Sequence, residues 1–179
     1  MKAMLLTILI LTAIALVAFL LKDSQIPPEN AKTITTDHIY ISWDIMEFDK
    51  CVAAWLIKRF IDKDAKFRFV PSDTEITEGT PFDVPGANWS RKHRKCTSQC
   101  ILESIDKPDP AIEQIVTIAS RTELNFWQLD RWPDTQKYFY EVKQIMDQTH
   151  NLNRCIEKTN IYFDKLYTNL KKISSKSHY

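Results

Sequence analysis

The densest positive charge in the sequence lies in one run of five residues: Arg91, Lys92, His93, Arg94 and Lys95. Thr97 follows shortly after and is a typical residue at the start of a helix. The free N–H groups and the dipole of a helix N-terminus favour anions, and arginine and lysine add charge-assisted hydrogen bonds to oxyanion oxygens. Arg91, Lys92, His93, Arg94 and Thr97 are therefore a candidate site for a tetrahedral oxyanion. The alternative is a solvated basic loop.

A second group of ionisable residues is scattered along the chain and consists of His93, Asp49, Asp83 and Glu123. An imidazole with carboxylates could hold a divalent metal ion or act as an acid–base pair. Their spacing is not diagnostic, because only the tertiary structure could bring them together. Asp49 has a simpler alternative role as the N-cap of the helix that follows it, and a lone histidine commonly makes ordinary hydrogen bonds.

The four cysteines allow a third kind of chemistry. Cys96 and Cys100 lie four residues apart at the expected helix start, where the dipole would stabilise a thiolate, so they are redox candidates. With His93 they do not form a standard zinc spacing. The alternatives are a structural disulfide or buried thiols, with Cys51 and Cys155 on apolar helix faces.

Composition excludes several functional classes. The formal net charge is +1, from 24 basic and 23 acidic residues, so no overall field favours a nucleic-acid partner. Only two glycines are present, Gly79 and Gly86, which excludes a dinucleotide fingerprint and a P-loop.

The elements expected to position these residues begin with a βαβ unit. Alternating apolar residues over 39–43 predict a strand with one buried face. An amphipathic helix should follow Asp49 and stop at residues 62–64, and a second strand should cover residues 65–70. Residues 81–86 predict a short edge strand, because proline cannot donate to a central ladder.

The C-terminal half predicts helices that begin near Asp109, with Pro110 in the first position, near Asp134 and near Leu152. We therefore expect an α+β domain over residues 38–172, with a three-stranded sheet packed on a helical half. Residues 173–179 are expected to form a basic tail.

The N-terminal segment predicts the compartment. Residues 3–21 carry no charge and are close to the length that spans a bilayer. Residues 1–22 are therefore a membrane anchor or a signal peptide, and residues 23–37 a polar tether. We expect a single-pass inner-membrane protein with its domain facing the periplasm, or a protein secreted to the periplasm.

Several motifs together resemble one known family. They are Asp49-Lys50 ahead of residues 55–62 (WLIKRFID), residues 65–71, residues 81–86 (PFDVPG), and Arg91 and His93 ahead of Thr97. This pattern resembles the C-terminal domain of ChrB-type chromate resistance proteins over residues 43–167. The chain departs from the family pattern at Ala53-Ala54, where many members have Cys-Pro, and at Ser98-Gln99, where many have Phe-Glu. It also lacks the glycine that typically follows the histidine.

The resemblance implies a link to chromate resistance, often beside a chromate efflux transporter. We therefore expect an accessory or sensor domain that binds chromate, another oxyanion or that transporter. The alternative is an extracytoplasmic metal- or thiol-dependent enzyme of unknown substrate. Full-length ChrB regulators carry an N-terminal DNA-binding part, and this sequence has an apolar segment in its place, so no nucleic-acid partner is expected.

Overall fold

A βαβ unit opens the part of the chain that the computed structural model describes, residues 38–176. Strand β1 (Ile39–Trp43) leads into helix α2 (Phe48–Leu56), and the chain returns as strand β2 (Lys66–Val70). The two strands are parallel, with Ile39 opposite Lys66 and Trp43 opposite Val70. The predicted βαβ unit is confirmed.

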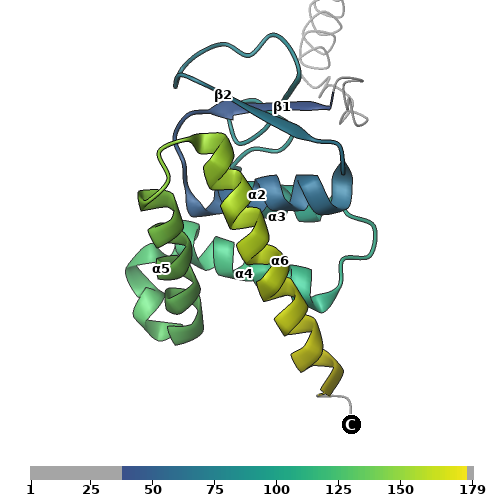
Figure 1. Cartoon of the computed structure of the whole chain (residues 1–179), viewed down its shortest axis with the longest axis vertical. Helices are drawn as coiled ribbons and strands as arrows, with labels where there is room; N and C mark the ends of the chain where they lie inside the picture. The colour runs from purple at the N-terminus through teal and green to yellow at the C-terminus, as the bar shows by residue number, and fades with distance from the viewer. Residues whose placement is uncertain (1–37, 177–179) are drawn as a thin grey trace, which may run out of the picture. The chain divides into compact units, whose positions relative to one another are not determined.

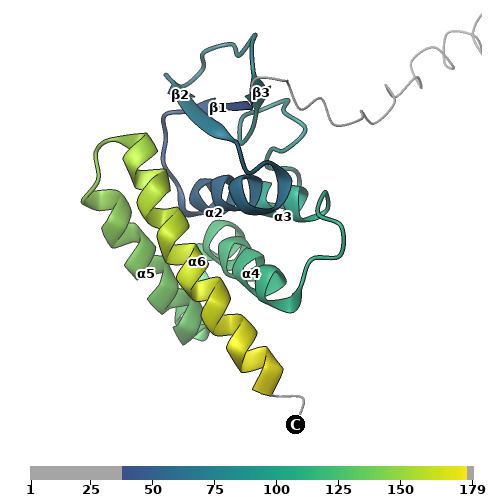
Figure 2. The same ribbon diagram turned by 45° about the vertical axis from the view of Figure 1, so that its right-hand side comes forward.

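The third strand, β3 (Thr80–Pro81), pairs with the other edge of β1 and is also parallel. The sheet order is β2-β1-β3, which places the proline on an edge strand as predicted. Figures 1 and 2 show the sheet on one side of α2 and the helix α3 (Thr97–Leu102).

The prediction that β1 buries one face is wrong, because both faces are covered. Tyr40, Ile41 and Ser42 are all buried. Tyr40 packs against Phe67 and Trp89 within the main core. Ile41 points to the opposite face, where Gly79 lies so close that an added Cβ would stand 2.9 Å from the Ile41 side chain. The connection between β2 and β3 therefore covers the Ile41 face, which the pattern predicted to be buried, whereas the face of Tyr40 and Ser42, which the pattern left to solvent, packs on the main core.

Helix α2 is the centre of the core, and all nine of its residues are buried. It begins at Phe48, and the residue at the N-cap position, Glu47, makes no capping hydrogen bond through its side chain. The helix widens into a π-helical turn over Ile57–Ile61 before the chain leaves it at Asp62.

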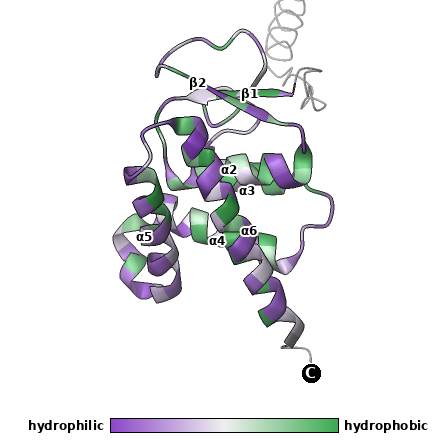
Figure 3. Ribbon diagram, in the orientation of Figure 1, coloured by the Kyte–Doolittle hydropathy of each residue, from purple (hydrophilic) through white to green (hydrophobic). Residues whose placement is uncertain are grey.

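Three longer helices complete the domain: α4 (Pro110–Leu124), α5 (Pro133–Asp147) and α6 (Leu152–Lys176), with a short helix η2 (Phe126–Arg131) between the first two. Asp109 caps α4 by accepting from the amides of Ala111 and Ile112 at 3.0 and 3.1 Å, as predicted. Helix α6 continues past residue 172, so most of the expected tail is helical. Figure 3 shows hydrophilic and hydrophobic bands alternating along α5 and α6, typical of helices with one face on a core.

The described residues thus form an α+β domain with a small parallel sheet and a mostly helical C-terminal half. None of the helices within residues 38–176 has the length and hydrophobicity needed to cross a bilayer. The predicted anchor or signal peptide and the polar tether lie outside the described residues, so both stay predictions.

Candidate functional site

Asp49 lies at the centre of a buried polar network, although it does not cap its own helix as predicted. Its carboxylate reaches across the domain to the start of α3, where Oδ2 accepts from the Thr97 amide at 2.7 Å and Oδ1 from the Ser98 amide at 3.1 Å. The side chain is buried. The Asp49 carboxylate therefore satisfies N–H groups that would otherwise be orphaned at the start of a helix 48 residues away in sequence.

Asp83 joins the same network through Thr97. The Thr97 hydroxyl donates to Asp83 Oδ1 at 2.5 Å, and Lys50 Nζ lies 3.5 Å from Asp83 Oδ2. Lys50 is itself buried and donates to the carbonyl oxygens of Trp43 and Ile45 at 2.7 and 2.5 Å. Its charge compensates Asp83, and its position is set by the chain that leaves β1.

Glu123, on the last turn of α4, is the third carboxylate of this group. Its Oε1 accepts from the Asp49 amide at 3.4 Å, and its Oε2 pairs with Arg91 Nη2 at 2.5 Å. Burial, followed by the charges of Asp49 and Glu47, raises the pKa of Glu123 to about 7, while Arg91 opposes this shift. Burial and then the charge of Asp83 also raise the pKa of Asp49, against hydrogen bonds that lower it.

The structure thus brings together Asp49, Asp83 and Glu123, which we call the carboxylate cluster, and leaves the fourth predicted member, His93, outside it. The His93 side chain is exposed and makes no hydrogen bond or ion pair with any residue in the range 38–176. A metal ion held jointly by His93 and the carboxylate cluster is therefore not supported by this arrangement. Lys50 and Arg91 supply positive charge to the cluster instead.

Residues 91–95 form an exposed basic turn, closed by two backbone hydrogen bonds between Lys92 and Lys95 at 3.0 and 3.1 Å. Arg94 has a positive φ of 64° within it. Arg91 pairs with Glu123, and Lys95 pairs with Glu103. The side chains of Lys92, His93 and Arg94 have no ion pair within the described part of the chain. Because Asp49 already accepts from the α3 amides, an anion at this turn would depend on side chains.

Cys96 and Cys100 do not have the thiolate character on which their candidacy for redox chemistry depended. Cys96, not Thr97, is the N-cap of α3, and its amide donates to Gln99 Oε1 at 3.0 Å. Burial, together with the charge of Asp49, raises the pKa of Cys96 to about 12, which outweighs the helix dipole. Burial also raises the pKa of Cys100, whose thiol donates to the Ser90 carbonyl at 3.3 Å.

All four cysteines are buried free thiols, including Cys51 on α2 and Cys155 on α6, as one of the predicted alternatives had it. The disulfide alternative is not seen. The buried and protonated state of Cys96 and Cys100 also argues against a thiol-dependent reaction at this site.

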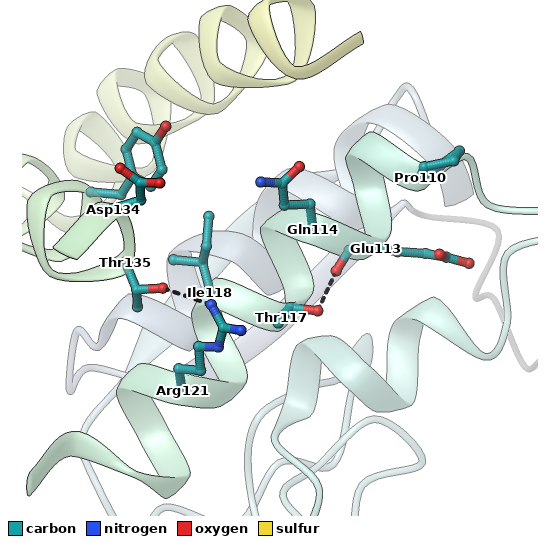
Figure 4. A pocket seen from close by; sticks show the side chains of 9 residues that line it. Pro110, Glu113, Gln114, Thr117, Ile118, Arg121, Asp134 and Thr135 are labelled. Carbon is teal, nitrogen blue, oxygen red and sulfur yellow. Dashed lines mark hydrogen bonds between the residues drawn. The ribbon is translucent and has the colours of Figure 1, made fainter. Parts of the chain in front are cut away.

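Two further features were missed by sequence reasoning. A pocket of about 340 Å³ lies between α4 and α5 (Figure 4). In its wall, Arg121 Nη1 donates to the Thr135 hydroxyl at 3.3 Å. No residue of the predicted sites lines it. The second feature is a group formed by His38, Asp62 and Asp64. The sequence shows two of these ligands as an Asp-x-Asp pair, Asp62 and Asp64, after the first helix. No local pattern indicates that His38, 24 residues before Asp62, lies beside them.

A small parallel sheet covered by helices, with a buried network of carboxylates and a lysine beside a basic turn, defines an α+β domain built around a polar site. The family model described as "ChrB, C-terminal domain" matches residues 40–170, most of the chain. The chain belongs to this family, which is associated with chromate resistance. No curated protein and no solved structure gives a significant match.

Four of the residues that carried the resemblance in the sequence, Asp49, Lys50, Asp83 and Thr97, contact one another in the buried network. Part of the pattern that resembles the family therefore lies in the side chains that hold the start of α3 against α2. At the two positions where this chain departs from the family next to Thr97, Ser98 donates its amide to Asp49 and Gln99 accepts from Cys96.

Proposed function

We propose that this protein is an accessory or sensor domain in chromate resistance, and that it binds a tetrahedral oxyanion at the basic turn. The observation that carries the proposal is the exposure of five consecutive basic side chains on a closed turn, of which Lys92, His93 and Arg94 have no ion pair within residues 38–176. Chromate is a tetrahedral dianion, and lysine and arginine bind such oxygens through charge-assisted hydrogen bonds.

The two ends of the turn are held by ion pairs to different helices. Arg91 is held to Glu123 on α4, and Lys95 is held to Glu103 at the end of α3. These pairs orient the turn while its central side chains stay available to a ligand. Arg91 could also donate to the anion, because its side chain is about half exposed and a guanidinium has several N–H donors.

Binding is tested by calorimetry of the full 179-residue chain in detergent against chromate, sulfate and phosphate. We expect chromate to bind, and Arg94→Gln and Lys92→Gln each to weaken binding by about tenfold or more, because a hydrogen bond to a charged group contributes about 1.5–3 kcal/mol. Both side chains are exposed, so the substitutions should leave the thermal stability nearly unchanged.

The matched control is Arg154→Gln, which removes an exposed arginine on α6. It should bind chromate as the wild type does. A flat trace with all three anions, or binding that survives loss of the turn charges, would contradict the proposal. Equal binding of chromate and sulfate would identify a general site for tetrahedral dianions.

An enzyme that uses the carboxylate cluster is the second candidate function. Glu123 favours it, since a carboxyl group with a pKa of about 7 beside a second carboxylate and an arginine is suited to proton transfer at neutral pH. Asp49 is less suited to this role, because both of its oxygens are used as acceptors for α3 amides. The titration of Glu123 that this function requires is tested by the pH experiment in the Discussion.

We also infer that the apolar segment of residues 3–21 holds the domain at the inner membrane, facing the periplasm, where a chromate efflux transporter would be within reach. The support is the length and hydrophobicity of the segment in the sequence. The full chain should fractionate with membranes and be released by detergent, and protease added to spheroplasts should degrade the domain. The double variant Leu11→Arg/Ala15→Arg should lose membrane association. Recovery of the unaltered chain in the cytoplasmic fraction would contradict this inference, and cleavage after residue 22 would support secretion instead.

A further inference from the structure

We propose that His38, Asp62 and Asp64 form a binding site for a divalent metal ion of the zinc type. Each residue offers one ligand atom, an imidazole nitrogen or a carboxylate oxygen, and these atoms all lie within 4.8 Å of one another. His38 Nδ1 is 2.8 Å from Asp62 Oδ2. The group is separate in sequence from the basic turn and from the carboxylate cluster, so the proposal does not depend on the function proposed above.

The backbone holds the three ligands at neighbouring ends of two strands. His38 directly precedes β1, and its carbonyl accepts from the Lys66 amide at 2.7 Å, where β2 begins. Asp62 ends the π-helical turn, with its amide donating to the Ile57 carbonyl at 2.8 Å. The Asp64 amide donates to Asp62 Oδ1 at 2.9 Å, which fixes the two carboxylates on the same short connection. π-helical turns are frequent next to functional sites.

A buried polar group with no partner supplies an independent observation. Tyr40 is fully buried, and its hydroxyl makes no hydrogen bond of acceptable geometry with any residue that the structure describes. Asp62 is the acidic side chain that interacts with this hydroxyl, although no hydrogen bond of good geometry joins the two groups. A metal ion that turned the Asp62 carboxylate slightly would let the hydroxyl donate to its free oxygen. This is the role that second-shell groups have in metal sites.

The chemistry of the ligands points to the class of metal. One imidazole with two carboxylates suits zinc or a similar transition metal, whereas magnesium and calcium prefer oxygen ligands alone. Zinc binds these atoms at about 2.0–2.2 Å, so tetrahedral ligands lie about 3.4 Å from each other. Asp64 is exposed and could rotate to close the remaining gap, and water would fill the fourth position. Such an ion would tie the start of β1 to the connection between the π-helical turn and β2.

The test is thermal denaturation and calorimetry of the full chain after removal of metals with a chelator, with Zn²⁺, Mn²⁺ and Mg²⁺ added separately. We expect Zn²⁺ to raise Tm by about 5 °C or more at saturation, because a ligand that binds only the folded state stabilises it. His38→Ala and Asp64→Asn should each abolish the shift. Mg²⁺ should give little or none.

The matched controls are His150→Ala and Asp73→Asn, which remove an exposed histidine and an exposed aspartate elsewhere in the domain and should keep the shift. If His38→Ala does not fold, the exposed Asp64→Asn variant decides the question. A Zn²⁺ shift that persists in Asp64→Asn would place the ion elsewhere, for example on the cysteines, and would overturn the proposal. Absence of any shift in the wild type would overturn it as well.

Discussion

Replacing Asp49 by alanine is expected to lower the free energy of unfolding by about 3–5 kcal/mol, because two buried hydrogen bonds to a charged acceptor, each contributing about 1.5–3 kcal/mol, would be lost. The amides of Thr97 and Ser98 would lose their acceptors in a buried place. Helix α3 is short and would also lose its N-terminal charge compensation. Lys50 would keep its ion pair with Asp83.

Urea denaturation of the full chain measures this effect, with Asp49→Asn as the graded variant. Asparagine keeps one acceptor oxygen at the same position, so we expect it to cost about 1–2 kcal/mol. Asp130→Ala is the control, since Asp130 is exposed, and it should change stability by less than about 0.5 kcal/mol. If Asp49→Ala were as stable as the control, the cross-domain cap would not contribute to stability.

Glu123→Gln is expected to remove a large pH dependence of stability between about pH 4.5 and pH 7. The pKa of Glu123 is raised from 4.5 to about 7 in the folded protein. Across this interval the folded state therefore holds a proton that the unfolded state has released. Stability is then greatest at the acidic end and falls as the pH rises through the interval. At about 1.36 kcal/mol for each pKa unit, the rise from 4.5 to about 7 means that the wild type should lose about 3 kcal/mol of stability across the interval, a loss that the glutamine variant should not show.

The measurement is urea denaturation of both proteins at intervals from about pH 4.5 to about pH 8, which covers the interval between the two pKa values. Glu113→Gln is the matched control, because Glu113 lies on the same helix and is exposed, and it should follow the wild type. Parallel curves for wild type and Glu123→Gln would mean that Glu123 titrates normally, and the acid–base candidate function would lose its support. Asp62, Asp109 and Asp164 have lowered pKa values, so the stability that they contribute is lost as the pH falls. Their effect therefore appears at more acidic pH and has the opposite sign to that of Glu123.

The Glu123→Gln substitution also tests whether the buried network affects binding at the basic turn, because Glu123 pairs with Arg91. The neutral amide of the Glu123→Gln variant would pair more weakly with Arg91 than the carboxylate does, which would release a guanidinium toward an incoming anion. We therefore expect any chromate affinity, measured by calorimetry above about pH 7 where chromate is a dianion, to rise in Glu123→Gln.

Local features of the sequence were sufficient to predict the βαβ unit, the proline on an edge strand and the Asp109 cap of α4. In each case the groups that interact lie within a few residues, or the pattern repeats along one element, so neighbouring residues contain the information. The family was also predicted correctly, because motifs such as residues 55–62 are specific as strings and require no knowledge of contacts.

The predictions that were wrong concern groups whose interaction partners lie far away in the sequence. Asp49 was assigned to its own helix, since the sequence does not show that the start of α3, 48 residues later, would lie against it. Cys96 was a redox candidate because its place at a helix start is local information, whereas its burial and the charge of Asp49, which raise its pKa, are not. The face of β1 that carries Tyr40 and Ser42 was left to solvent by the alternating pattern, because the core that buries it is built by residues distant in sequence, such as Trp89.

The sequence by itself determined the order of the elements, the polar residue types available and the membership of the ChrB C-terminal family. Only the tertiary structure decided which of those residues meet: the carboxylate cluster without His93, and His38 with Asp62 and Asp64. The physical reason is that protonation, capping and metal binding depend on distances of a few ångströms between groups brought together by packing. Residues far apart along the chain acquire those distances only when the helices and the sheet bury their apolar faces against one another.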